Sequence, residues 1–149
     1  MKPEIDLVMQ GLALTLITEV MPELHAEYSL GDAGVIVAAM LAAAQEYDRA
    51  ADVRATDNAE MRALFAEAAR VVEDRVLQDR LTQASDTRDA SLRVSSLNEA
   101  NDRLKALLIE LQVYVEECRA DWAPVLEKRV WAHLVQSAAR RKLLLPVLG

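Results

Sequence analysis

The sequence has few of the residues that build disulfide-stapled, fibrous or disordered proteins. It holds one cysteine, four glycines and four prolines in 149 residues. An internal disulfide framework is therefore excluded, and neither a fibrous nor a disordered chain is expected. Aromatic residues make up only 4%, β-branched runs are scarce, and strong helix formers dominate. This composition predicts an all-α protein.

Long hydrophobic runs and a basic N-terminus are also missing. The longest apolar run, Ala33–Ala44, has 12 residues, whereas a membrane span requires about 20. The first residues carry Glu4 and Asp6 where a signal peptide carries positive charge. The formal net charge of −7 argues against nucleic acids and anionic membranes as partners. We expect a cytoplasmic protein that contacts neither membrane nor nucleic acid.

Sequence patterns for metals, phosphates and nucleophilic catalysis are absent. Neither His25 nor His133 follows a glutamate by three residues, as the ligands of di-iron bundles do. Together with Cys118 these histidines lie in three separate segments, without the spacing of a zinc site. No nucleophile-elbow, P-loop or dinucleotide fingerprint occurs. We therefore expect no metal, no cofactor and no catalytic residues.

The clearest element is a helix from Ser96 to Trp122. Ser96 and Glu99 have the spacing of a capping box, and one face repeats at alternating steps of four and three. That face comprises Leu97, Asn101, Leu104, Leu108, Leu111, Val115, Cys118 and Trp122. Cysteine on such a stripe usually acts as a small hydrophobic residue. Asn101 either fixes the register of the helix or lies near its end in solvent.

Two further patterns divide the first half of the chain into helices. Ala33–Ala44 is apolar on every side and rich in small residues, so we expect it to run through the centre of a bundle. Asp57 and Glu60 have the spacing of a capping box, which predicts that another helix begins there after a turn. The predicted fold is an antiparallel bundle of four long helices plus a short connecting helical segment. It forms a single domain over residues 1–149, with a polar loop at about 82–95 and an apolar tail at 143–149.

A polar cluster at the turn between these two helices is the best candidate for a ligand site. Arginines beside a helix N-terminus can hold a carboxylate or a phosphate. The simpler interpretation is a set of surface ion pairs around two helix ends. The candidate residues are Arg49, Asp52, Arg54, Asn58 and Arg62.

Surplus apolar surface favours association as the function. Ile109 and Val113 lie on the side of the central helix that should be wet, and the chain ends in an apolar tail that either folds back over the bundle or docks on another protein. The lead hypothesis is a non-catalytic protein that forms a homo-oligomer, with a dimer expected, or serves as an accessory subunit of a protein partner. The alternative is a small-molecule or anion-binding protein, or an enzyme subunit, that uses the polar cluster. The expected interface residues are Ile109, Val113, Leu144, Leu145, Val147 and Leu148.

Overall fold

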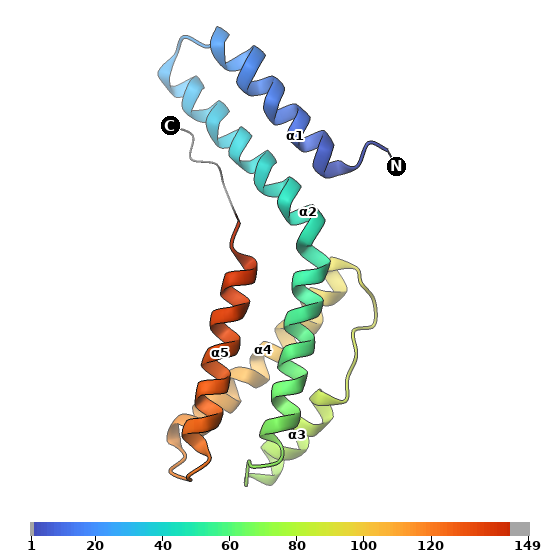
Figure 1. The fold of residues 1–149 in the computed structure, drawn as a ribbon, viewed down its shortest axis with the longest axis vertical. Coiled ribbons are helices and arrows are strands. Elements are labelled where there is room, and N and C mark those ends of the chain that lie inside the picture. The colour runs from blue at the N-terminus through green and yellow to red at the C-terminus, as the bar shows by residue number, and fades with distance from the viewer. Residues whose placement is uncertain (1, 144–149) are drawn as a thin grey trace. The chain divides into compact units, whose positions relative to one another are not determined.

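The computed structural model describes residues 2–143, and these residues contain helices and no β-strand. The all-α prediction is confirmed. The α-helices are α1 (Ile5–Thr15), α2 (Glu27–Ala68), α3 (Arg75–Ser85), α4 (Val94–Glu117) and α5 (Ala123–Arg141) (Figure 1). The chain groups into two compact units. Of the described residues, unit 1 contains 2–50 together with 142–143, and unit 2 is Ala51–Arg141.

Unit 1 is a helical hairpin made of α1 and the first half of α2. After α1 the chain widens into a π-helix over Leu16–Val20 and then tightens into a 3₁₀ turn over Met21–Glu23. Pro22 lies in the 3₁₀ turn, directly after the π-helix. Proline lacks an N–H, and in a regular α-helix its ring would clash with the carbonyl four residues earlier, so the helix is irregular at this point. The few buried side chains of the hairpin are small: Ala13, Ala33, Val37, Ala44 and Ala50.

The expectation that Ala33–Ala44 runs through the centre of a bundle is not met. Val37 is fully buried, but Val35 is 70% exposed and Ile36 48% exposed. In unit 1 the hairpin places α1 along one side of this segment (Figure 1). A single neighbouring helix covers only one face, so the rest of the apolar circumference stays in solvent.

Unit 2 contains the main hydrophobic core. Its helices are the last part of α2 together with α3, α4 and α5. Each contributes an apolar stripe to one cluster of buried side chains. The largest members are Met61, Leu64, Phe65, Val72, Leu77, Leu81, Leu104, Leu107, Leu108, Leu111, Val115, Leu126 and Val130.

The predicted face of α4 is buried as expected. Leu97, Asn101, Leu104, Leu108, Leu111 and Val115 are all buried. The predicted ends differ: α4 begins at Val94, its N-cap Arg93 makes no side-chain capping bond, and Cys118 is the C-cap. The capping box at Ser96 is therefore wrong. Trp122 lies beyond the helix, where its ring stacks on Tyr114 with centroids 6.3 Å apart.

The predicted turn before a helix that starts at Asp57 is also wrong. α2 continues through it as one helix of 42 residues, and the chain turns instead after Ala68. Asp74 then caps α3 by accepting a hydrogen bond from the Leu77 N–H at 2.7 Å. Because α3 extends to Ser85 and α4 starts at Val94, the loop predicted at about 82–95 is shorter than expected. The tail residues Leu144, Leu145, Val147 and Leu148 lie outside the described residues.

Candidate functional site

A buried ionic network in unit 2 joins α2 to the end of α5. Its centre is Asp57, whose side chain is fully buried. Asp57 Oδ2 accepts from Ser137 Oγ at 2.8 Å and from Arg141 Nε and Nη2 at 2.9 and 2.7 Å. Asp57 Oδ1 accepts from Arg140 Nη2 at 2.9 Å. Both carboxylate oxygens are thus saturated by donors from one helical turn of α5.

The surroundings of Asp57 hold it in the charged form. Burial raises the pKa of a carboxyl, but the hydrogen bonds from Arg141, Arg140 and Ser137 act in the opposite direction and outweigh it. The pKa of Asp57 therefore lies below its usual value. A carboxylate in this state is a poor general base, so the arrangement favours a structural role.

A second carboxylate extends the network along α2. Glu60 Oε1 accepts from Arg140 Nη1 at 2.9 Å, and Glu60 Oε2 lies 3.2 Å from His133 Nδ1. A histidine paired with a glutamate needs a nucleophile to act in hydrolysis. The nearest serine on α5, Ser137, donates to Asp57 instead. The geometry is that of an ion-pair cluster and not of a catalytic triad.

Two asparagines carry the network from α2 to α4. Asn101 Nδ2 donates to Asn58 Oδ1 at 2.8 Å, and Asn101 Oδ1 accepts from Arg141 Nη2 at 3.2 Å. Asn58 Nδ2 donates to Asp89 Oδ1 at 3.0 Å and to the Leu97 carbonyl at 3.2 Å. Asn101 is 3% exposed, so of the two interpretations of this residue the structure favours the one in which it sets the register of α4.

The predicted ligand residues are distributed along α2. Arg54, Asn58 and Arg62 share one face at steps of four residues. Arg54 Nε donates to Asn98 Oδ1 at 2.6 Å, and Arg62 Nη2 pairs with Asp89 Oδ1 at 2.7 Å. Asn58 and Arg62 thus converge on the same carboxylate oxygen of Asp89.

The other two predicted ligand residues are not part of this convergence. Asp52 is exposed on α2. Arg49 belongs to unit 1, where its Nη1 donates to the Lys142 carbonyl at 3.2 Å. The structure therefore brings Asn58 and Arg62 together, engages Arg54 separately, and leaves these five residues without a common ligand position.

The partners of Asp57 were missed by the sequence analysis. Arg140 and Arg141 lie in the last turn of α5, where positive charge would in any case complement the exposed carbonyls of a helix end. One signal was present: Asp57 lies four residues before Met61 and seven before Leu64, which places it on the buried stripe of α2. A carboxylate at such a position requires partners, although the sequence does not say which ones.

No buried side-chain polar atom within residues 2–143 lacks a hydrogen-bond partner. In the same part of the chain, no three histidine, cysteine, aspartate or glutamate side chains are grouped as metal ligands. Cys118 is a free, half-buried thiol.

Unit 1 presents a different kind of surface, which is apolar. Large side chains on both helices of the hairpin are exposed: Leu7, Leu12, Leu14, Ile17, Val20, Tyr28, Leu30, Val35, Ile36 and Tyr47. The segments Ile5–Glu23 and Glu27–Ala68 are long and apolar enough to cross a membrane by length and composition alone. Buried core helices of soluble proteins and signal sequences pass the same test, but only 6% and 17% of these two apolar windows is buried.

No family model, curated protein or solved structure matches this chain.

Proposed function

We propose that this protein acts by self-association, without catalysis, and that two copies meet through the apolar hairpin of unit 1. The observation that carries the proposal is the exposure of large apolar side chains along both hairpin helices, with Leu14 at 60% and Val35 at 70%. Large apolar side chains exposed in this number on one short hairpin favour an interaction site, because their removal from water is favourable.

Glycines on the hairpin support a close approach by another helix. A Cβ added at Gly11, Gly31 or Gly34 would meet no atom within 4 Å. Packing within the described chain therefore does not explain why these positions lack a side chain. Small residues on a helix let a second backbone come near, which increases the contact area between apolar helices.

Acidic residues favour a second copy over a lipid bilayer as the partner of this surface. The charge-free runs are Leu7–Thr18 with 12 residues and Ala33–Gln45 with 13. At 1.5 Å per residue they span about 18 and 20 Å, whereas the hydrocarbon core of a bilayer is about 30 Å thick. Asp32 and Glu19 would enter that core at a cost of several kcal/mol if they stayed charged.

The mass of the protein in solution, measured by light scattering over a range of concentrations, tests this proposal. We expect a dimer for the natural chain and monomers for Leu14→Glu and Val35→Glu, since a charge at either position would be buried in the interface. Val125→Glu is the matched control, because Val125 is an equally exposed valine of unit 2. This variant should remain dimeric.

The same measurement on Ile109→Glu separates two interfaces. Ile109 and Val113 are 63% and 50% exposed on α4, the face that the sequence analysis assigned to a partner subunit. If Ile109→Glu dissociates the dimer and the hairpin variants do not, the interface lies on α4 and the hairpin proposal is wrong. A natural chain that is monomeric, or that floats with phosphatidylcholine vesicles through unit 1, would also overturn it.

A further inference from the structure

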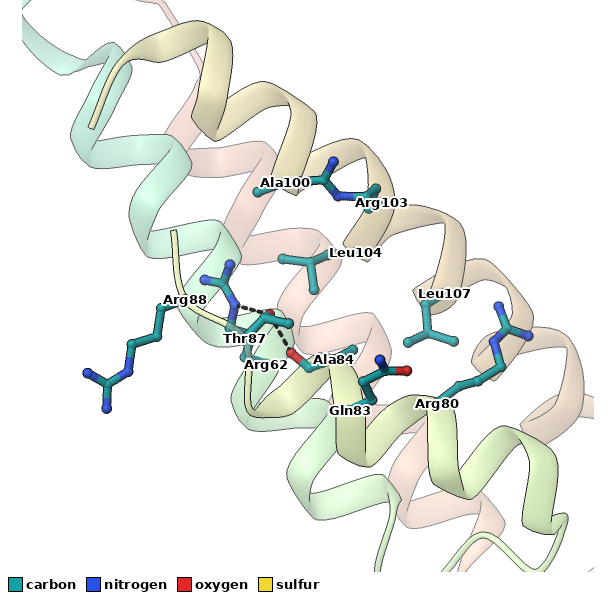
Figure 2. Close-up of a pocket in the computed structure, with 10 residues that line it drawn as sticks. All are labelled: Arg62, Arg80, Gln83, Ala84, Thr87, Arg88, Ala100, Arg103, Leu104 and Leu107. Carbon is teal, nitrogen blue, oxygen red and sulfur yellow. Dashed lines mark hydrogen bonds between the residues drawn. The ribbon is translucent and has the colours of Figure 1, made fainter. Parts of the chain in front are cut away.

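Unit 2 contains a cavity that neither the core nor the buried network fills. Its volume is about 470 Å³, and it lies between α3 and α4, with one residue of α2 at its edge. Cavities of about 300–1,000 Å³ are typical of small-molecule sites. Figure 2 shows the residues that line it: Arg62, Arg80, Gln83, Ala84, Thr87, Arg88, Ala100, Arg103, Leu104 and Leu107.

The floor of the cavity is apolar and firmly held. Leu104, Leu107 and Ala100 project from α4 and are 5%, 7% and 8% exposed. Ala84 completes the floor from α3 (Figure 2). Because Leu104 and Leu107 also belong to the hydrophobic core, the floor is part of a packed structure, and an apolar group placed on it would be removed from water.

The rim of the cavity is positively charged. Four arginines line it, and none of its described lining residues is acidic. Two of the arginines are neutralised from outside the lining: Arg62 pairs with Asp89 at 2.7 Å, and Arg80 forms a two-pronged pair with Glu110. The chain as a whole has a net charge of −7, whereas the charged residues that line this cavity are all arginines. The charge around the cavity is therefore opposite in sign to that of the whole chain.

The other two rim arginines have no partner among residues 2–143. Arg88 follows α3 and is exposed, and Arg103 is exposed on α4. Figure 2 places the Arg103 guanidinium beside Ala100, whereas the Arg88 side chain extends away from the other lining residues. Arg88 thus lines the cavity with its guanidinium turned outward, and rotation about the bonds of its long side chain would bring the guanidinium toward a bound anion.

We infer that this cavity binds an organic anion, with an apolar body on the leucine floor and a carboxylate or phosphate held by Arg103 and Arg88. The planar guanidinium matches both oxyanions with paired hydrogen bonds. This inference does not depend on self-association through unit 1. It also differs from the ligand site expected from the sequence, since Arg62 is the one residue that the two sets share.

Calorimetric titration with 1-naphthyl phosphate tests the inference on the full chain. Two partial ligands accompany it: inorganic phosphate, which has the charge alone, and 1-naphthol, which has the apolar body alone. We expect saturable binding of 1-naphthyl phosphate at least about tenfold tighter than that of either partial ligand. 2-Naphthoate in the same titration shows whether carboxylate or phosphate is preferred.

Single substitutions locate the binding. Arg103→Gln and Arg88→Gln should each weaken 1-naphthyl phosphate about tenfold, and Ala84→Leu should block it by filling the floor. Arg75→Gln is the control, since Arg75 is an exposed arginine on α3 that does not line the cavity. Leu14→Glu tests whether ligand binding depends on self-association. Because Leu14 does not line the cavity, this variant should bind 1-naphthyl phosphate with unchanged affinity. The inference is overturned if 1-naphthyl phosphate fails to bind, if inorganic phosphate binds equally well, or if the three cavity variants behave like Arg75→Gln.

Discussion

Arg141 on α5 donates twice to a single oxygen of Asp57 on α2, with Nε at 2.9 Å and Nη2 at 2.7 Å from Oδ2. The two residues are 84 positions apart in sequence, and the carboxylate is fully buried while the Arg141 side chain is 37% exposed. The pair therefore fastens the C-terminal end of α5 to the interior of unit 2. Arg140 and Ser137 also donate to Asp57, and Asn101 accepts from Arg141. Because removal of Asp57 would disrupt several of these hydrogen bonds at once, its effect on stability is larger than that of losing one surface ion pair.

Replacing Asp57 by asparagine should destabilise the protein strongly. Asp57→Asn preserves size but removes the charge that faces both arginines, and breaking a buried ion pair from one side costs about 3 kcal/mol or more. We expect the lower end of that range, because Arg140 keeps its pair with Glu60. Urea unfolding measures the change. Asp52→Asn, at an exposed position of the same helix, should change the free energy of unfolding by less than about 0.5 kcal/mol; equal effects of the two variants would contradict a structural role for the network.

The same carboxylate should make stability depend on pH in the acid range. The pKa of Asp57 is lowered in the folded protein, whereas an unfolded aspartate titrates near about 3.9. The folded state thus binds fewer protons, so the stabilisation is present above about pH 4 and is lost as the pH falls through the lowered folded pKa. We expect Asp57→Asn to flatten the pH dependence of unfolding between about pH 5 and 2. Parallel curves for the two proteins would show that other carboxylates cause it.

The face of α4 could be predicted because the information is local. The repeat from Leu97 to Val115 determines which side of the helix is apolar, and the structure buries that side while Ile109 and Val113 stay exposed. Helix ends are less well encoded: Ser96 and Glu99 have capping-box spacing, yet α4 begins two residues earlier at Val94.

The network and the cavity could not be predicted, because their residues come from distant segments. Asp57 and Glu60 carry a pattern that at a helix start would be a capping box. In the structure both side chains are used by Arg140 of α5 instead, and tertiary pairing of this kind overrides a local signal. The cavity likewise depends on how α3 lies against α4. Arg88 and Arg103 are 15 positions apart and fall in no motif, so their shared position on one rim follows only from the fold.

Proline at position 56 distinguishes the continuous helix from the predicted turn. In the structure Thr56 lies inside α2 (Glu27–Ala68), where proline removes a backbone hydrogen bond and clashes with the carbonyl four residues earlier. Thr56→Pro should therefore destabilise the protein by about 3 kcal/mol or more. A helix that began at Thr56 or Asp57 would accept proline with little loss, since the first N–H groups of a helix have no partner within it.

Val94→Pro provides the matched control for that substitution. Val94 is the first residue of α4. The preceding residue, Arg93, already has extended backbone angles, with φ −63° and ψ 133°. The N-cap of α3, Asp74, has a similar φ of −66°. Proline is favoured at this position and suits such a preceding residue. Urea unfolding of both variants should give a large loss for Thr56→Pro and a loss of less than about 1 kcal/mol for Val94→Pro. Two small losses would mean that a new helix starts near Asp57, as the capping-box spacing predicted. The continuous α2 that places Asp57, Asn58 and Glu60 in the network would then be wrong.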